Sequence, residues 1–187
     1  MFYAGIGSRR TPPDILNLME RLGFALGVMG YTLRSGAADG ADSAFERGAL
    51  AGGHPIEIYL PWYRFHGRDG PGYILTKDPQ VNGWARHLVE MAHPAPHKLT
   101  NMAKMLMARN TYQVAGLGQG VLSEFVVCWT PDGVEEGDKT TRDTGGTGQA
   151  IRLASLWNIP VFNLQRSDTI DRLNQFLRLP KSPKETK

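Results

Sequence analysis

A glycine-rich turn at residues 144–150 (Thr-Gly-Gly-Thr-Gly-Gln-Ala) is the segment of the sequence best suited to bind an anion. It follows the apolar run 125–129 and a polar loop, and it precedes the helix-like segment 151–157. Glycines let the main chain approach a phosphate closely, and the unpaired N–H groups and dipole of a helix start attract one. The turn therefore predicts a phosphate-bearing ligand.

Two more glycine-containing turns follow apolar segments near the start of the chain. Residues 7–10 (Gly-Ser-Arg-Arg) come after the strand-like run 2–6, and residues 35–40 (Ser-Gly-Ala-Ala-Asp-Gly) come after the run 31–34. In open parallel sheets, ligands bind outside the carboxyl ends of the strands. We therefore expect the three turns to converge on one site.

Strand-like and helix-like segments alternate along the chain, which is typical of the α/β fold class. The pattern predicts a single Rossmann-like domain over residues 1–179, with about five mostly parallel strands and helices on both faces. Residues 62–80, rich in aromatic, Gly and Pro residues, are predicted as a long loop. The expected strands are 2–6, 31–34, 56–60, 125–129 and 160–164, and the expected helices are 14–29, 41–51, 81–91, 100–115, 147–157 and 169–178.

The composition is that of a folded protein of one domain. The chain has 187 residues, of which 41% are hydrophobic and 21% charged. Its apolar runs fall short of the ~20 residues of a membrane span, and no signal peptide is visible, so we expect a cytoplasmic protein without membrane contact. Cys128 lies in an apolar run and is predicted to be a buried thiol.

The net positive charge of the sequence comes from its last ten residues. The sequence holds 21 basic and 18 acidic residues, and the segment 178–187 contains four of the basic residues and one of the acidic ones. The rest is therefore balanced, with seventeen of each. Proteins that bind nucleic acid usually carry a basic surface, so this balance of charge favours a small ligand. It does not exclude a local basic patch. Residues 180–187 are predicted to be a basic, flexible tail.

The glycine turns and one Arg-Asn pair together resemble a known superfamily. The matching segments are 5–9, 35–42, 109–110 and 145–148, and the resemblance covers roughly residues 2–165. The superfamily, called SLOG, is Rossmann-like and joins the lonely-guy nucleotide phosphoribohydrolases, the DNA-processing protein A family and related nucleotide sensors. Because its members are often dimers, the resemblance also implies a homo-oligomer.

The resemblance implies a nucleotide or nucleotide-derived ligand and assigns a set of residues to its site. These are Gly7, Ser8 and Arg9 on one wall, Ser35, Gly36, Asp39, Gly40 and Asp42 on another, Arg109 and Asn110, and Gly145, Gly146, Thr147, Gly148 and Gln149 around the phosphate.

The sequence departs from the lonely-guy motif, Pro-Gly-Gly-x-Gly-Thr-x-x-Glu, where catalysis requires it. In register, Thr144 stands for the Pro, Gln149 for the Thr and Arg152 for the Glu that supports N-glycosidic cleavage. Arg109 could correspond to that family's other functional residue. A binding protein, either a sensor or a sequestering protein, is therefore our first hypothesis. A nucleotide N-glycosidase is the second, with Asp39, Asp42 or Asp132 able to replace the missing carboxylate.

The third hypothesis is a single-stranded DNA-binding protein of the DNA-processing type. It depends on residues 109–110, on the following segment 114–117 and on residues 35–37.

The long loop contains four aromatic residues, Trp62, Tyr63, Phe65 and Tyr73. Their side chains could stack a base or cover the sheet edge, and their place in a long loop favours stacking.

No metal or further cofactor is predicted. His87, His93 and His97 are spaced by six and four residues across two prolines, which does not match a metal site.

Overall fold

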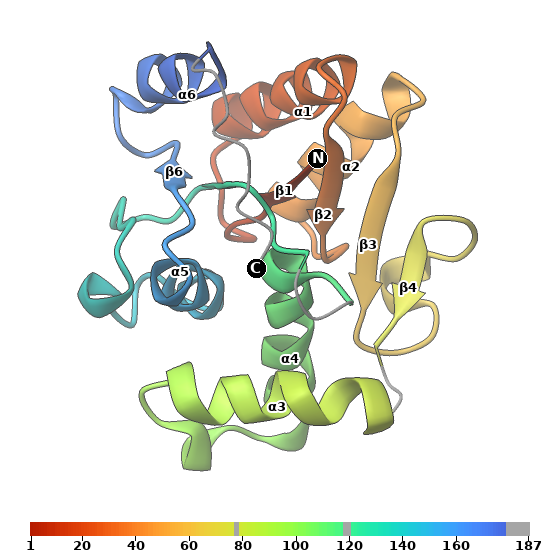
Figure 1. Ribbon diagram of the computed structural model, residues 1–187, viewed down its shortest axis with the longest axis vertical. Helices are drawn as coiled ribbons and strands as arrows, with labels where there is room; N and C mark the ends of the chain where they lie inside the picture. Colours follow the sequence, from red (N-terminus) through yellow and green to blue (C-terminus); the bar gives the residue numbers. More distant parts are fainter. Residues whose placement is uncertain (77–78, 118–120, 179–187) are drawn as a thin grey trace, which may run out of the picture.

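The computed structural model of the chain describes residues 1–76, 79–117 and 121–178 (Figure 1). The predicted tail, residues 180–187, lies outside these ranges. The strands are β1 (Phe2–Gly5), β2 (Thr32–Ser35), β3 (Ile56–Leu60), β4 (Tyr73–Leu75), β5 (Val126–Cys128) and β6 (Val161–Asn163). The helices are α1 (Pro13–Val28), α2 (Ala41–Ala51), α3 (Pro79–Ala92), α4 (Asn101–Ala115), α5 (Thr147–Leu156) and α6 (Thr169–Arg178), with short 3₁₀ turns η1 (Phe65–Gly67), η2 (Pro96–Lys98) and η3 (Gly137–Lys139).

All the strands pair in parallel in one sheet, in the order β4-β3-β2-β1-β5-β6. The chain winds outward from β1 in one direction through β2, β3 and β4, and then returns to the other side of β1 with β5 and β6. Ala4 of β1 lies level with Arg34 of β2 and with Val126 of β5. The point at which the strand order reverses therefore lies between β1 and β5, where such sheets bind ligands.

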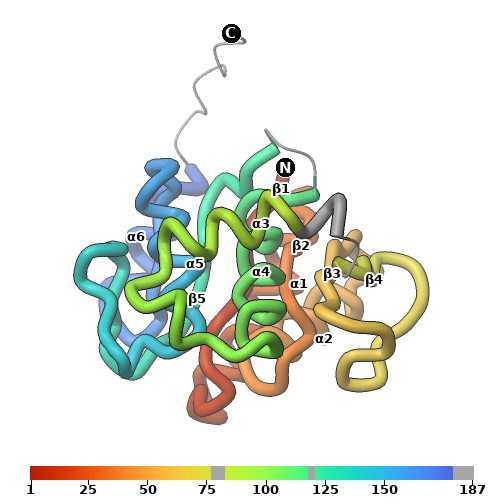
Figure 2. Tube along the Cα trace, turned by 90° about the horizontal axis from the view of Figure 1, so that it is seen from below, coloured from red at the N-terminus to blue at the C-terminus, as the bar shows by residue number. Residues whose placement is uncertain are grey.

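Helices cover both faces of the sheet. Helices α1, α2 and α6 lie on one face, and α4 and α5 lie on the other (Figure 1). Helix α3 lies across α4 and α5 as an outer layer (Figure 2). The predicted α/β, Rossmann-like architecture is confirmed.

One strand was not predicted. Residues 73–75, which the sequence assigns to a loop, form β4, and Ile58 of β3 pairs with Tyr73. Three residues that follow the Gly-Pro-Gly segment 70–72 are too few to show a strand's alternation of apolar and polar side chains. None of the helices in the described ranges is long and apolar enough to cross a membrane.

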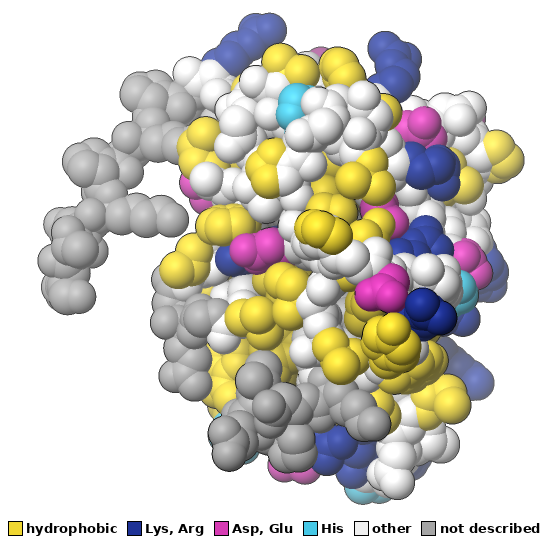
Figure 3. All heavy atoms as spheres, turned by 90° about the vertical axis from the view of Figure 1, so that its right-hand side faces the viewer, with side chains coloured by type: hydrophobic (Ala, Val, Ile, Leu, Met, Phe, Trp, Pro, Cys, Tyr) yellow, Lys and Arg dark blue, Asp and Glu magenta, His cyan; other side chains and the backbone are white. Residues whose placement is uncertain are grey.

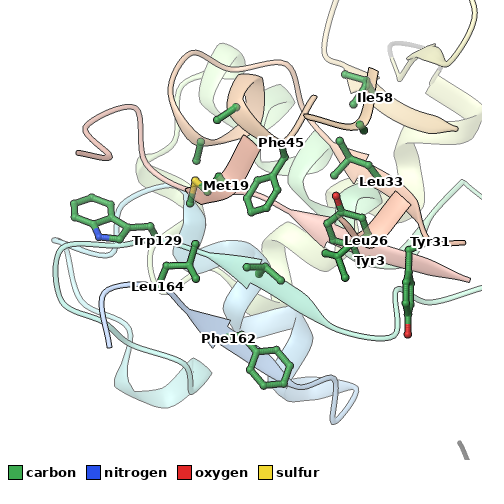
Figure 4. Packing of buried hydrophobic residues seen from close by; sticks show 14 of the residues in the cluster. Tyr3, Met19, Leu26, Tyr31, Leu33, Phe45, Ile58, Trp129, Phe162 and Leu164 are labelled. Atoms are coloured by element: carbon green, nitrogen blue, oxygen red, sulfur yellow. The ribbon is translucent and has the colours of Figure 1, made fainter. Parts of the chain in front are cut away.

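The core lies on both sides of the sheet because successive strand residues face opposite ways. Tyr3 packs under α1 and α2 beside Phe45 (Figure 4), and its ring stacks on Phe125 with the ring centroids 5.7 Å apart. Ala4 faces the other way and joins the cluster that includes Val126 and Cys128. The predicted burial of Cys128 is confirmed, and burial raises the pKa of its thiol.

Helices α1 and α2 cross closely because each has a glycine at the crossing. A Cβ atom on Gly23 would lie 2.6 Å from the carbonyl oxygen of Phe45, and one on Gly48 would collide with the carbonyl oxygen of Glu20. A main-chain atom in a packed helix cannot move aside as the end of a flexible side chain can. The two glycines therefore set the distance between these helices, and with it the place of the turn that precedes α2.

We predict that Gly48→Ala lowers the free energy of unfolding by about 1–3 kcal/mol, because the added methyl overpacks the crossing. Gly83→Ala is the matched control, since an added Cβ on this exposed residue of α3 would meet no atom within 4 Å. That variant should gain about 0.5–1 kcal/mol from helix propensity. Urea unfolding followed by circular dichroism measures both, and equal midpoints for the two variants would contradict the close crossing.

Candidate ligand-binding cleft

A cleft of about 460 Å³ lies outside the carboxyl ends of β1, β2 and β5. The turns after these strands form its walls, and one face of α4 closes it. It lies at the reversal of strand order, as the sequence predicts for the three turns. Its lining residues are Ile6, Gly7, Ser8, Arg9, Arg10, Ala38, Asp42, Leu106, Met107, Arg109, Asn110, Gln113, Asp143, Thr144, Gly145, Gly146 and Thr147.

The turn after β1 is held by its own hydrogen bonds. The Ser8 N–H donates to the carbonyl of Trp129 at 3.2 Å, and Thr11 Oγ1 donates to the carbonyl of Ser8 at 2.7 Å. The Arg10 N–H donates to Ser8 Oγ. The turn thereby presents Arg9 and Arg10, both exposed residues, at the cleft. Their guanidinium groups supply positive charge for an anionic ligand.

Asp42 and Arg109 form a buried ion pair in the wall of the cleft. Asp42 Oδ2 lies 3.6 Å from Arg109 Nη2, and both side chains are less than one-tenth exposed. Burial raises the pKa of Asp42 and lowers that of Arg109, while the attraction between the two charges opposes both shifts. Arg109 still keeps its proton, because a guanidinium titrates far above neutral pH.

Arg109 also connects the turns to one another. Its Nη1 donates to the carbonyl of Gly36 at 2.5 Å, and its Nε and Nη2 donate to Asn110 Oδ1. Asn110 Nδ2 in turn donates to the carbonyl of Gly146 at 3.0 Å. These bonds join the turn after β2 to the glycine-rich turn through two neighbouring residues of α4.

The glycine-rich turn offers free main-chain donors at the start of α5. Gly145 has a φ of +62°, and Gly146 has the helical values −63° and −27°. The N–H groups of Gly148 and Gln149 already donate to the carbonyls of Gly145 and Gly146. In the described part of the chain, the N–H groups of Gly146 and Thr147 have no acceptor. These two are the groups able to bind a phosphate here.

Asp132 holds the glycine-rich turn in place. Its carboxylate accepts hydrogen bonds from Thr130, Thr141 and Thr144, the last of which lines the cleft. Although partial burial acts to raise its pKa, these hydrogen bonds keep the pKa of Asp132 below the usual value. Asp132 therefore supports the site from outside the cleft lining.

Several residues of the predicted site do not line the cleft. Ser35 Oγ is buried and donates to the carbonyl of Gly5, and Gly36 reaches the site only through the bond from Arg109. Asp39 is exposed and lies 3.3 Å from His66 Nδ1. The others outside the lining are Gly40, Gly148 and Gln149, and the buried side-chain amide of Gln149 has no hydrogen-bond partner among the described residues.

Of the three aspartates able to replace the missing carboxylate, only Asp42 lines the cleft within the described residues. Arg152, which stands at the motif's Glu position, is outside the lining, and its Nη1 donates to Thr140 Oγ1. Among the described residues no cluster of three or more His, Cys, Asp and Glu could hold a metal ion.

The loop aromatics that the sequence favours for base stacking lie outside the cleft lining. None of the four lines the cleft: Phe65 is buried, Trp62 packs against it at 4.9 Å, and Tyr73 Oη donates to Glu46. The loop lies on the β4 side of the molecule, where hydrophobic side chains lie among acidic and basic ones (Figure 3). Arg68 ties the loop to α2 through Ser43 and Glu46.

Sequence reasoning missed other lining residues. Leu106, Met107 and Gln113 share the cleft face of α4 with Arg109 and Asn110 at helical spacing, which is the signal that could have found them. Asp143 and Thr144 immediately precede the predicted glycine-rich turn, and Arg10 follows Arg9.

The fold is that of a Rossmann-like α/β protein, and the cleft lies at the reversal of strand order. Comparison with protein-family models found no match, and comparison with curated proteins found none either. Among solved structures, DNA processing protein A from Helicobacter pylori matches at 19% sequence identity and a TM-score of 0.57. The match covers 94% of this chain and 72% of that one. The solved structure concerns the way in which that protein binds single-stranded DNA. At 19% identity, the match shows a shared fold.

Proposed function

We propose that this chain binds a nucleotide or nucleotide derivative through its phosphate, as a sensor or a sequestering protein. The observation that carries the proposal is the pair of free N–H groups of Gly146 and Thr147 at the start of α5, inside a cleft shared with Arg9 and Arg10. Helix starts with free N–H groups bind phosphates, and basic side chains add to the attraction. The cleft volume of about 460 Å³ is within the range of small-molecule sites.

We predict that Gly146→Asp abolishes nucleotide binding. Gly146 has a helical φ of −63°, and its added Cβ would lie 3.5 Å from the nearest atom, Met107 Cε, so a side chain fits without strain. The new carboxylate would then repel the phosphate. Calorimetry with a nucleoside monophosphate tests this, and Gly83→Asp on the exposed face of α3 is the control. Unchanged affinity in a folded Gly146→Asp variant would remove the turn from the site.

The place of Asp42 supports the N-glycosidase as an alternative, because it brings a buried carboxylate beside Arg109 into the cleft. The bonds of Asp42 to Arg109 and to the Ala38 N–H favour a structural role instead. We therefore expect inosine 5′-monophosphate to be recovered intact after long incubation, as measured by chromatography. Release of free base at a catalytic rate, lost in Asp42→Asn, would favour the hydrolase.

Single-stranded DNA binding is the other alternative, and the likeness to DNA processing protein A favours it. Because the net positive charge of the sequence lies in residues 178–187, we expect DNA binding to be weak and to depend on the tail. Removing residues 180–187 should abolish most of it, whereas Arg9→Ala should change it little. Fluorescence anisotropy with oligothymidine at two salt concentrations measures both effects, with a salt slope of about −0.7 per phosphate contact. Nanomolar binding by the truncated protein, lost in Arg9→Ala, would place DNA in the cleft.

A further inference from the structure

Gln113 of α4, in the wall of the cleft, has a buried side-chain amide nitrogen without a partner among the described residues. The residue is 1% exposed, and its Nε2 has no acceptor among the described residues. A buried amide donor left without a partner costs free energy, and native structures rarely retain one. An acceptor on a bound ligand would satisfy the Gln113 amide.

The Gln113 amide lies one helical turn beyond Asn110, whose Nδ2 donates to the carbonyl of Gly146 in the glycine-rich turn. A Cβ on Gly36 would collide with Gln113 Nε2, which places the amide directly against the turn after β2. Two residues of α4 contact Gly146: Asn110 donates to its carbonyl, and an added Cβ on Gly146 would be 3.5 Å from Met107 Cε. The distances along the helix axis to Gln113 are about 4.5 Å from Asn110 and about 9 Å from Met107, at 1.5 Å per residue. With its phosphate at Gly146, a nucleotide is long enough to bring its base to Gln113.

The charge around Gln113 favours a neutral acceptor over a second phosphate. Arg109 contacts the same glycine, but its charge is compensated by Asp42 at 3.6 Å, and its Nη1 is used by the carbonyl of Gly36. The donor without an acceptor in this part of the cleft wall is thus the uncharged amide of Gln113, which lies beside a neutralised ion pair. Such a donor suits a carbonyl oxygen, which accepts hydrogen bonds and carries no charge.

We propose that Gln113 determines which nucleotide this chain binds, by donating from Nε2 to a carbonyl oxygen of the base. The ligand class is then a nucleotide with an oxo base, such as hypoxanthine, guanine or uracil. This inference rests on the proposed function, since it requires the phosphate to lie at Gly146 and Thr147. A site with a buried donor rejects an analogue that lacks the acceptor, because the donor then remains unpaired.

The test is calorimetry with inosine 5′-monophosphate and purine riboside 5′-monophosphate, which lacks the base carbonyl. The unaltered protein should bind the first about tenfold to a hundredfold more tightly. Gln113→Leu, close in size but without the donor, should remove that preference, and Gln113→Glu should weaken binding of inosine 5′-monophosphate further. Gln149→Leu is the matched control: it also removes a buried, unpartnered amide, but one outside the cleft lining, and should keep the preference.

The outcomes separate this inference from the proposed function. If the unaltered protein binds both nucleotides equally, or if folded Gln113→Leu keeps the preference, Gln113 does not read the base and phosphate binding still stands. Equal binding of the two, together with weaker binding of 2′-deoxyinosine 5′-monophosphate that Gln113→Leu abolishes, would assign the amide to a sugar hydroxyl and overturn the carbonyl assignment. If none of these nucleotides binds, the proposed function fails, and the inference fails with it.

Discussion

The buried guanidinium of Arg109 is the contact on which the cleft depends. It donates to the carbonyl of Gly36, pairs with Asp42 at the start of α2, and donates to Asn110, which holds the carbonyl of Gly146. Removing a charge from water is costly unless it is paired and hydrogen-bonded, and these partners meet both conditions. The contact also explains Gly36, since a Cβ there would lie 2.5 Å from Arg109 Cζ. Arg109 thereby holds the turn after β2, the start of α2 and the glycine-rich turn around the cleft.

The sheet and the helix crossing determine where those segments can meet. The reversal of strand order puts the turns after β1 and β5 side by side, and the glycines at the α1–α2 crossing set the position of the turn before α2. On the other side, Asp132 fixes the glycine-rich turn through three threonine hydroxyls. The walls of the cleft are therefore held by hydrogen bonds within the chain, and preorganisation of this kind lowers the entropy lost on binding.

The sequence was sufficient to predict the α/β fold and the convergence of the three turns, because strand ends and glycine turns are local signals. Within the predicted site it could not separate main-chain from side-chain roles. Gln149 belongs to the glycine-rich motif, yet its side chain is buried outside the cleft lining. Gln113 lies outside every motif and enters the cleft because of helix packing. Strand β4 and the packing of Phe65 depend on long-range pairing, which a local pattern does not record.

The charges around the cleft limit the kind of anion it can hold. Arg9 and Arg10 add positive charge to the lining, but Asp143 lines the same cleft next to the glycine-rich turn, and the charge of Arg109 is already compensated by Asp42. A long polyanion would gain little from such a mixed surface, since its affinity grows with each phosphate that a cation neutralises. One phosphate needs only two main-chain donors and a nearby cation. The balance of charge thus favours a ligand with a single phosphate end, whose remaining atoms are recognised by uncharged groups.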